Sequence, residues 1–439
     1  MSARQGPKEA QCTIVSLNHD GAGVGRSEGK VVFVDGALPG EEVRFRYTAR
    51  KRRYDIGVAQ EIMTASPERV APRCEYFGVC GGCCLQHLDA EAQLRAKEGI
   101  VREAMAHIAK VGVEEWAPPL SGPVYGYRRK ARLGARVVDK KGGLLVGFRE
   151  RRRSYITPLL TCQTLDARMG LKLAPLKGLL ERLSRPESIP QVEFAAGDLS
   201  AALVLRHVEP LTDTDRERIT AFGREHGFSV YGQSGGPDTV SLMGGEALPL
   251  RYALPEFDVD LEFGPGDFVQ VNAVANRAMV KQAVDWLDVR KDSRVLDLFC
   301  GLGNFTLPLG RRAQTVLGVE GAAALVERGL ANARRHGLTH IEFAAADLDV
   351  FGLDTLLEDR VWDRALLDPP RTGALAAVGV LAKRGVPRIV YVSCNPATLA
   401  RDADVLVHQF GYRLTRAGVI DMFPHTHHIE TMALFERDL

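Results

Sequence analysis

The chain from residue 266 onward repeats one local pattern, in which a short apolar run leads into a glycine turn, a helix-forming stretch and the next apolar run. The pattern can be followed through RVLDLFCGLGNFTLPLG, TVLGVEGAAALVERGLANARRHG, IEFAAADL, RALLDPPRTG and RIVYVSCNP. Parallel strands need a long crossover between them, so this alternation predicts a doubly wound, Rossmann-like α/β sheet. Such sheets bind ligands at the carboxyl ends of their strands, and the residues after each apolar run are therefore the first candidates for a site.

The 439 residues are too many for one hydrophobic core, and the local pattern changes along the chain. Residues 1–67 contain short β-rich runs between glycine turns, which predicts a small β-barrel. Residues 68–265 contain a strongly periodic helix over 89–111 and then mix strand-like and helical stretches, which predicts a central α+β domain. Residues 266–439 would form the α/β domain, so the sequence predicts a multidomain α/β protein.

The first residues and the lengths of the apolar runs indicate in which compartment the protein is found. The first residues contain no apolar run ahead of a small-residue cleavage site, and no stretch approaches the roughly 18 apolar residues of a membrane span. We therefore expect a cytoplasmic protein. Structural disulfides are rare in that compartment, so clustered members of the eight cysteines are better interpreted as metal ligands or catalytic thiols.

The charge is unevenly distributed, although the formal net charge is only +2. Up to residue 160 there are 27 Lys and Arg against 18 Asp and Glu, and afterwards there are 30 against 37. The basic excess lies in residues 44–55, 125–136 and 148–155, where Arg and Lys alternate with Phe and Tyr. Any one of these runs could be a solvated strand face. Three of them with interleaved aromatic residues favour a nucleic-acid partner.

The run VLDLF is followed by a turn that contains Gly301 and Gly303, which let backbone amides approach a ligand closely. Thr306 stands where the dinucleotide fingerprint has its third glycine, so a nicotinamide cofactor is disfavoured. Glu320 ends the next apolar run and can accept hydrogen bonds from two ribose hydroxyls. Asp347 follows the third run and can accept from an adenine amino group. Together these features predict a ligand that combines adenosine with an amino acid.

Cys394 comes directly after the apolar run IVYVS and before an Asn-Pro step, so we expect it at the carboxyl end of a buried strand. A core cysteine is the competing interpretation. The Asp368-Pro-Pro sequence after the preceding run would also fit enzymes that methylate amino groups of bases. A thiolate, however, can add to carbon 6 of uracil and make carbon 5 nucleophilic. The carbon 5 proton must then leave to a general base, and Glu430 is available just before the last strand-like run.

These segments, taken in order, resemble known enzymes. The set of D-x-F-C-G-x-G, a strand-terminal Glu and a later Asp resembles the cofactor site of class I S-adenosylmethionine methyltransferases. FVQVN, DLFCGLGNF, DPPR, VSCNPATLARD and DMFPHTHHIE together resemble the RNA uracil-C5 methyltransferases over the whole C-terminal part. The resemblance implies S-adenosylmethionine as cofactor, Cys394 as nucleophile and Glu430 as base. The cofactor-binding residues that it implies are Gln270, Phe299, Asn304, Glu320, Asp347 and Asp368.

The sequence departs from the pattern of that family at two positions. Asp347 stands where relatives often have Asn, and either residue can accept from an adenine amine. His427 stands where glycine is common, in the loop that leads to Glu430. His425, His427 and His428 could suggest zinc, but three histidines so close on one loop cannot readily converge on an ion. We expect the target base to be extruded from its stack before Cys394 attacks it.

Cys74, Cys80 and Cys83 form a C-x5-C-x2-C motif, and Cys162 lies downstream. Four thiolates can bind zinc or an iron–sulfur cluster. Structural zinc sites usually show two close pairs, so a triplet with a distant fourth cysteine favours a 4Fe-4S cluster. The resemblance to ribosomal RNA uracil methyltransferases implies the same cluster on these cysteines. Cys84 is an alternative ligand, and the remaining cysteines match no ligand spacing.

The N-terminal region, with HDGAGVGR and VFVDGALPGEEV, resembles a TRAM domain, which is an RNA-binding module. Relatives that act on tRNA generally lack both the barrel and the cluster, so the resemblance implies 23S ribosomal RNA as substrate. We expect a monomer, without an obligate protein partner, that methylates carbon 5 of one uridine through a covalent cysteine–uracil adduct. Two alternatives stay open: a different uridine in rRNA or tRNA, and a non-catalytic iron–sulfur RNA-binding protein. The second is disfavoured because a binding protein has no use for a nucleophile matched to a base.

Overall fold

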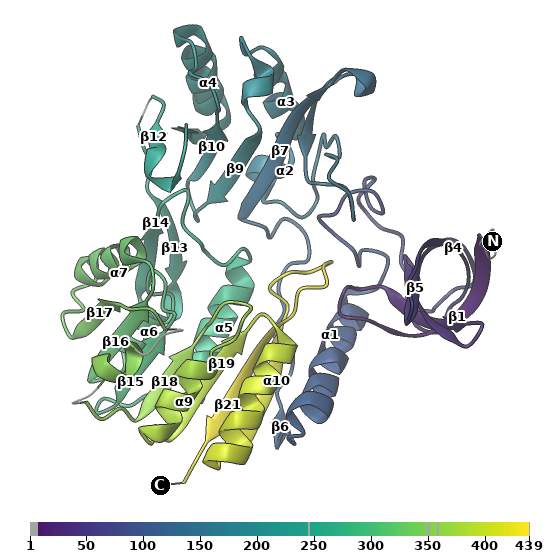
Figure 1. Ribbon diagram of the computed structural model, residues 1–439. Helices are drawn as coiled ribbons and strands as arrows, with labels where there is room; N and C mark the ends of the chain where they lie inside the picture. The colour runs from purple at the N-terminus through teal and green to yellow at the C-terminus, as the bar shows by residue number, and fades with distance from the viewer. Residues whose placement is uncertain (1–7, 245, 349–351, 358–359, 439) are drawn as a thin grey trace. The chain divides into compact units, whose positions relative to one another are not determined.

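The computed structural model describes residues 8–244, 246–348, 352–357 and 360–438 (Figure 1). In this part of the chain no helix is both long and apolar enough to cross a membrane. Contacts divide the chain into two compact units, and the boundaries of the three domains inferred from the sequence stay predictions. Unit 1 comprises Met1–Ile100, Arg149–Thr157 and Phe423–His428, and unit 2 comprises Val101–Phe148, Pro158–Met422 and Ile429–Leu439.

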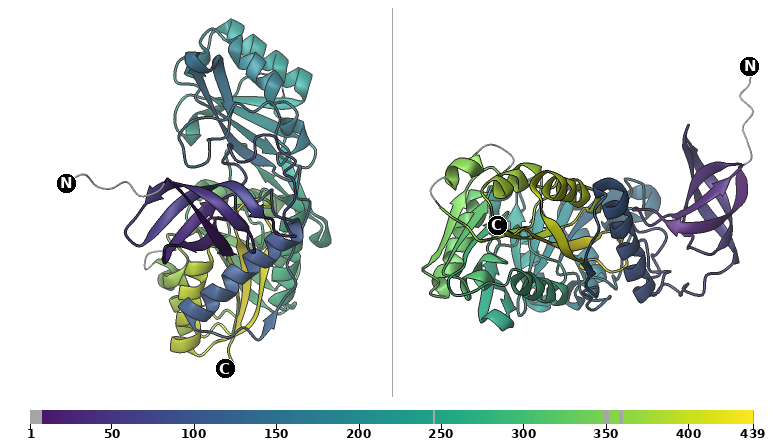
Figure 2. Two further views of the ribbon diagram at one scale, coloured as in Figure 1. Left: turned by 90° about the vertical axis from the view of Figure 1, so that its right-hand side faces the viewer. Right: turned by 90° about the horizontal axis from the view of Figure 1, so that it is seen from below.

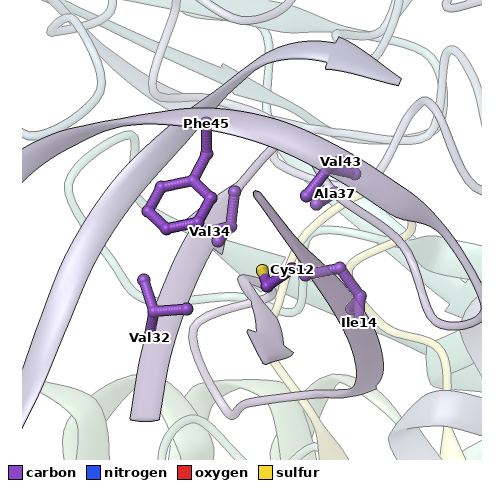
Figure 3. Close-up of a cluster of buried hydrophobic side chains, with 7 residues drawn as sticks. All are labelled: Cys12, Ile14, Val32, Val34, Ala37, Val43 and Phe45. Atoms are coloured by element: carbon purple, nitrogen blue, oxygen red, sulfur yellow. The ribbon is translucent and has the colours of Figure 1, made fainter. Parts of the chain in front are cut away.

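Unit 1 begins with a closed barrel, as predicted, whose strands are hydrogen-bonded in the order β1-β2-β3-β5-β4. The strands are β1 (Glu9–Leu17), β2 (Gly23–Ser27), β3 (Lys30–Asp35), β4 (Glu42–Arg50) and β5 (Tyr54–Thr64). Side chains alternate along β4, where Val43 and Phe45 are buried and Arg44 and Arg46 are exposed. The inward residues form the core shown in Figure 3: Cys12, Ile14, Val32, Val34, Ala37, Val43 and Phe45.

Helix α1 (Ala90–Ala104) begins where the sequence predicts, because the Asp89 side chain accepts a hydrogen bond from a backbone N–H of its first turn. Gln93, on this helix, is only 1% exposed. Its side-chain amide donates to the carbonyl of Leu88 at 2.8 Å and accepts from the backbone N–H of His425 at 2.8 Å. These bonds fasten segment 423–428 to the first hundred residues within unit 1.

Unit 2 contains an eight-stranded sheet in the order β17-β16-β15-β18-β19-β21-β20-β6. Strands β15 to β19 are mutually parallel, and β21 is antiparallel to both β19 and β20. The strands are β6 (Glu115–Trp116), β15 (Arg294–Leu298), β16 (Thr315–Glu320), β17 (Ile341–Ala345), β18 (Arg364–Leu367), β19 (Arg388–Ser393), β20 (Arg413–Ile420) and β21 (Glu430–Glu436). The strand order reverses at β15, which puts a topological switch point between β15 and β18.

Helices lie on both faces of this sheet, as the alternating sequence pattern predicts (Figures 1 and 2). They are α5 (Ala273–Trp286), α6 (Thr306–Gly310), α7 (Ala323–Arg335), α8 (Gly352–Leu356), α9 (Leu375–Lys383) and α10 (Pro396–Asp404). The central strands read as continuous apolar runs because both of their faces are covered, and every residue of β19 after Arg388 is buried.

A second sheet of unit 2, in the order β12-β11-β10-β9-β7-β8, corresponds to the predicted α+β region. Its strands are β7 (Lys130–Val138), β8 (Gly143–Gly147), β9 (Gln191–Ala196), β10 (Ala201–Arg206), β11 (Phe228–Gln233) and β12 (Val240–Leu242). Short helices accompany it: α2 (Ala167–Gly170), α3 (Leu173–Glu181) and α4 (Asp213–His226). Only β10 and β11 are parallel in this sheet; its other pairs are antiparallel.

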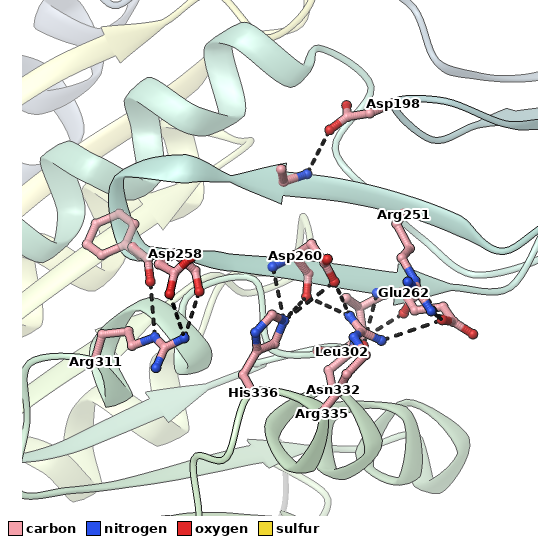
Figure 4. A network of polar contacts seen from close by, with 12 residues as sticks. Asp198, Arg251, Asp258, Asp260, Glu262, Leu302, Arg311, Asn332, Arg335 and His336 are labelled. Carbon is pink, nitrogen blue, oxygen red and sulfur yellow. Dashed lines mark hydrogen bonds and ion pairs between the residues drawn. The ribbon is translucent and has the colours of Figure 1, made fainter.

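A hairpin of β13 (Leu250–Leu254) and β14 (Val259–Phe263) docks on helix α7 (Figure 4). Asn332, which is 1% exposed, accepts from the backbone N–H of Glu262 at 2.9 Å and donates to the Glu262 carbonyl at 3.1 Å. Its amide also lies 3.4 Å from the carbonyl oxygen of Leu302, in the glycine turn. The hairpin is therefore bonded to the same elements that carry the candidate site.

Candidate active site

Cys394 and Glu430 come together through the register of an antiparallel strand pair. Cys394 follows the last residue of β19, and Glu430 is the first residue of β21. Ser393 is paired with Thr431, so the next position of β19 comes opposite Glu430. Cys394 is half-buried, whereas Glu430 is 6% exposed. The Cys394 thiol and the Glu430 carboxylate, which are 36 positions apart in the sequence, therefore lie together at the carboxyl end of β19.

The surroundings of Cys394 favour its protonated form in the ligand-free protein. Burial raises the pKa of this thiol to about 11, and the negative charges of Glu430 and then Asp368 act in the same direction. The positive charge of Arg371 opposes them. A thiolate at this position consequently requires a change that accompanies binding, such as the arrival of positive charge.

The turn after β15 has an unusual backbone conformation. Phe299, Gly301 and Gly303 have φ angles of +62°, +56° and +100°. For Phe299 this is a sparsely populated conformation of the kind that concentrates at functional sites. The φ angle of Gly303 is one that residues with a Cβ atom rarely adopt, and an added Cβ would also lie 2.5 Å from the Leu307 side chain, so glycine is strongly favoured there. The turn lies at the switch point between β15 and β18.

Glu320, at the end of β16, is held by two backbone N–H groups. Its Oε2 accepts from Gly301 at 3.1 Å, and its Oε1 accepts from Ala322 at 3.0 Å. Each carboxylate oxygen has a second lone pair, which can accept from a ligand hydroxyl. The carboxylate is thus oriented in advance, and its capacity to bind both hydroxyls of a ribose is preserved.

A cluster of carboxylates lies beside the turn, and sequence reasoning missed one of them. Asp297, in β15, is fully buried, and its Oδ2 accepts from the Thr306 hydroxyl at 2.5 Å. Its other oxygen has no hydrogen-bond partner among the described residues. Burial raises the pKa of Asp297 to about 8, with contributions from the charges of Asp368 and Glu320. The carboxylic residue inside the apolar run VLDLF was the available sequence signal.

Asp368, directly after β18, is the third carboxylate. Burial raises its pKa to about 7. With Glu320 it brings negative charge to the carboxyl edge of the sheet, beside Asp297, whose raised pKa keeps that residue protonated at neutral pH. A cationic ligand or one rich in hydroxyl groups would compensate this charge.

The other predicted cofactor residues follow the same edge or lie in the segment before α5. Asp347 comes two residues after β17 and is exposed, and Gln270 is half-buried between β14 and α5. The Asn304 side chain is bonded within the protein: its Oδ1 accepts from the Tyr252 hydroxyl and from Asn276 Nδ2, both at 2.9 Å. Asn304 therefore holds the glycine turn to β13 and α5, whatever contact it makes with a ligand.

Cys300 also lies at the carboxyl end of β15, but it is a core residue. It is 3% exposed, and its Sγ would be 2.9 Å from a Cβ atom placed on Gly318 in β16. Burial raises its pKa well above the ordinary value. The core-cysteine interpretation that the sequence left open for Cys394 thus applies to Cys300.

The cysteines of the C-x5-C-x2-C motif lie in unit 1, whereas Cys162 lies in unit 2. Cys80 is buried, and its Sγ accepts from the backbone N–H of Gly82 at 3.4 Å. In the part of the chain that the structure describes, no three Cys, His, Asp or Glu side chains are gathered in a group that could hold a metal ion. The ligand set of Cys74, Cys80, Cys83 and Cys162 stays a prediction.

The histidines before Glu430 belong to unit 1. The His427 Nδ1 atom lies 3.7 Å from the Cys84 Sγ, and the rings of His427 and His428 are 4.5 Å apart. The backbone carbonyl of His425 accepts from the N–H groups of Cys84 and Leu85 at 2.9 and 3.0 Å. This loop is packed against the cysteine-containing segment, and the unusual His427 contributes to that packing.

The chain resembles known proteins in both sequence and structure. Residues 256–438 match the family model described as tRNA (Uracil-5-)-methyltransferase, and residues 8–57 match the TRAM domain. The chain is 51% identical over 437 residues to the 23S rRNA (uracil(1939)-C(5))-methyltransferase RlmD of Alkalilimnicola ehrlichii, covering 99% of this chain and 98% of that protein. It is 49% identical to the protein of the same name from Alcanivorax borkumensis, with 97% and 96% covered.

A solved structure of similar architecture is the Pyrococcus abyssi tRNA (uracil-54, C5)-methyltransferase in complex with S-adenosyl-L-homocysteine. The TM-score is 0.74 at 25% sequence identity, with 97% of this chain and 100% of that chain covered. A tRNA enzyme thus matches nearly the whole chain, so this architecture alone does not separate rRNA-directed from tRNA-directed enzymes. The sequence identity to the rRNA enzymes is about twice the identity to this tRNA enzyme.

Proposed function

We propose that this chain, which belongs to the RlmD family of 23S rRNA (uracil-C5)-methyltransferases, transfers a methyl group from S-adenosylmethionine to carbon 5 of a uridine in 23S rRNA. The relatives' names give position 1939 for that uridine, and we propose the corresponding site here. The observation that carries the proposal is the pairing of a half-buried thiol, Cys394, with a buried carboxylate, Glu430, across β19 and β21.

The chemistry requires both groups. Cys394, as the thiolate, adds to carbon 6 of the extruded uracil, and the electron pair of the carbon 5–carbon 6 double bond moves to carbon 5, delocalised onto the carbonyl oxygen of carbon 4. Carbon 5 then attacks the methyl group of the sulfonium, whose carbon–sulfur bond breaks and leaves a neutral thioether. Glu430 removes the proton from carbon 5. The electrons of that carbon–hydrogen bond re-form the double bond, and Cys394 is expelled.

The residues at the neighbouring strand ends fit S-adenosylmethionine by their chemistry. Glu320 keeps lone pairs for both ribose hydroxyls, and Asp347 can accept from the adenine amino group. Asp368 contributes negative charge opposite a cation. We propose that Gln270, Phe299 and Asn304 complete this site.

The barrel is proposed to bind RNA. Arg44, Arg46 and Arg50 project outward along β4, and the Arg50 guanidinium lies 3.9 Å from the centre of the Tyr47 ring. Arginines beside an aromatic ring can neutralise phosphates and stack on bases. We expect the protein to act as a cytoplasmic monomer.

We also propose a 4Fe-4S cluster on Cys74, Cys80, Cys83 and Cys162. Its support is the spacing of the cysteines and the Gly82 N–H that points at the Cys80 sulfur, since hydrogen bonds to sulfur tune such clusters. No step of methyl transfer is assigned to it. Anaerobically purified protein should contain iron and acid-labile sulfide, with broad visible absorption, and should lose them in a Cys80→Ala variant but keep them in Cys300→Ala. Stoichiometric zinc without sulfide would contradict the cluster.

The experiment for the main proposal is transfer of a labelled methyl group from S-adenosylmethionine to 23S rRNA from a strain that lacks the modification. We expect incorporation at one uridine, with mass spectrometry placing the methyl group on carbon 5. Methylation of a base amino group or of a ribose oxygen would refute the proposed chemistry. Transfer to tRNA in preference to rRNA would refute the proposed substrate.

A further inference from the structure

The loop of residues 371–374 links two parts of the candidate site. It follows Asp368 at the end of β18 and leads into α9, and it contains Arg371, whose charge acts on Cys394. Helix α10 begins two residues after Cys394. This helix supplies side chains that hold the loop, although none of them figures in the reaction described above.

The first contacts are made to backbone carbonyls of the loop. Asn395 Nδ2 donates to the Arg371 carbonyl at 3.1 Å. The Thr398 hydroxyl lies 3.3 Å from the same oxygen and 3.2 Å from the Asn395 carbonyl, so its single proton is shared between the two. An Arg401 nitrogen, Nη2, donates to the Thr372 carbonyl at 3.0 Å. The chain that follows Cys394 is thereby connected to the chain that carries Arg371.

Asp402 is the centre of these contacts and is completely buried. Its Oδ2 accepts from the backbone N–H of Ala374 and from the Tyr391 hydroxyl, both at 2.8 Å. Its Oδ1 accepts from two nitrogens of Arg401 at 2.8 and 2.7 Å. A buried carboxylate with this set of donors is oriented rigidly, and Arg401 is oriented with it.

Gly373 lets the loop approach these side chains. Its φ angle is +78°, and a Cβ atom at this position would lie 2.6 Å from the Arg401 Nη2 and 2.7 Å from the Asp402 Oδ2. Only glycine permits this approach. The loop is therefore fixed at both of its ends and in its middle by residues of α10 and by Asn395, which caps this helix.

We propose that Thr398, Arg401 and Asp402 are positioning residues, which hold loop 371–374 so that the Arg371 guanidinium stabilises the Cys394 thiolate as it adds to uracil. This inference rests on the proposed function and adds to it one cation that favours the thiolate form of Cys394. Arg371 is the cation that acts against the burial and the two carboxylates around Cys394. Its effect depends on distance, so a loop that shifts away from α10 weakens it.

The test measures the reactivity of Cys394 directly. Alkylation by iodoacetamide is followed at this cysteine by peptide mass spectrometry across a range of pH, which reports its thiolate fraction without methyl transfer. Arg401→Gln removes the clamp, and Arg401→Lys keeps the positive charge but not the planar fork. We expect both variants to raise the midpoint pH of alkylation by about one unit. Arg371→Gln should raise it similarly.

Combined variants separate positioning from a direct effect. Arg401→Lys added to Arg371→Gln should cause no further shift, because the clamp acts only through Arg371. Thr398→Val should raise the midpoint less than the Arg401 variants, and Thr398→Ser should restore the wild-type value, since it keeps the hydroxyl. Asp215→Asn is the matched control. Like Asp402, Asp215 is a buried carboxylate, 2% exposed, that accepts from a backbone N–H, that of Ser184. It lies on α4, beside the second sheet and away from Cys394 in the fold.

Each outcome bears on one claim. Unchanged midpoints in the Arg401 and Thr398→Val variants, or additive shifts in the combined variant, would overturn the positioning role. A shift of similar size in the midpoint for Asp215→Asn would show that the shifts arise from general destabilisation, which would also overturn the positioning role. Methyl transfer to 23S rRNA by the wild-type protein is measured in parallel, because its absence would refute the proposed function instead.

Discussion

The carboxyl ends of β15 and β19 each carry a cysteine, and the two differ in what surrounds them. Cys300 is packed against β16 at 3% exposure, whereas Cys394 is half-buried beside β21 and Glu430. Burial raises the pKa of both thiols. The nucleophilic cysteine therefore cannot be recognised by a lowered thiol pKa in the ligand-free protein. Its access to a substrate and its pairing with a base distinguish it.

The largest expected effect separates these two cysteines. Cys394→Ala should reduce methyl transfer by at least roughly 10⁴-fold, because the covalent route is lost. It should also abolish the covalent adduct with RNA containing 5-fluorouridine, in which fluorine cannot leave as a proton does. Labelled-methyl assays and denaturing gels measure the two effects. Cys300→Ala should change turnover by less than a few-fold, and a reversed result would exchange the roles assigned to the two strand ends.

The next effect concerns the base beside Cys394. Glu430→Gln should slow methyl transfer by about 10²- to 10⁴-fold while the methylated covalent intermediate accumulates on ordinary RNA, because the carbon 5 proton cannot leave. Glu436→Gln, at the other end of the same strand, is the control. Slow transfer without any trapped protein–RNA species in Glu430→Gln would assign the base elsewhere.

A smaller effect is expected for Asp368, which we propose as a cofactor-binding residue beside Cys394. Asp368→Asn should weaken S-adenosylmethionine binding by about 10- to 100-fold, as expected for the loss of a charged hydrogen-bonding partner. It should also lower the midpoint pH for alkylation of Cys394, because a negative charge near the thiol is removed. Calorimetry and alkylation measure these changes. Asp363→Asn, at the other end of β18, should alter neither quantity.

The smallest effect on turnover is expected for Asp297, where stability is the better measure. Its pKa is raised from 3.8 to about 8 in the folded protein, so between these pH values the folded state holds a proton that the unfolded state releases. The contribution of this group to stability is present at low pH and is lost as pH rises towards 8. Asp297→Asn cannot titrate, so its free energy of unfolding relative to wild type should increase from about pH 5 to about pH 8 in urea titrations. A constant difference would contradict the raised pKa.

Some features around Cys300 and Cys394 can be predicted from the local sequence, and others cannot. The runs before Cys300 and Cys394 are both apolar and both end at a polar or glycine-containing turn, so strand ends could be predicted for each. Gly301 and Gly303 predicted the turn after β15, because glycine readily adopts the positive φ angles found there. The buried Asp297 was missed, since its environment depends on strands that are distant in the sequence.

The sequence by itself determined the barrel, the alternating α/β elements and the motifs at the strand ends, because periodicity and turn chemistry are local properties. The sequence pointed to Cys394 and Glu430, but only the tertiary structure places the two positions opposite each other, because the β19–β21 register is set by pairing between segments far apart in the chain. Tertiary structure likewise decided that Arg401 and Asp402 hold the loop after β18. Hydrogen bonds of this kind depend on a three-dimensional distance of a few ångströms, which spacing along the chain does not encode.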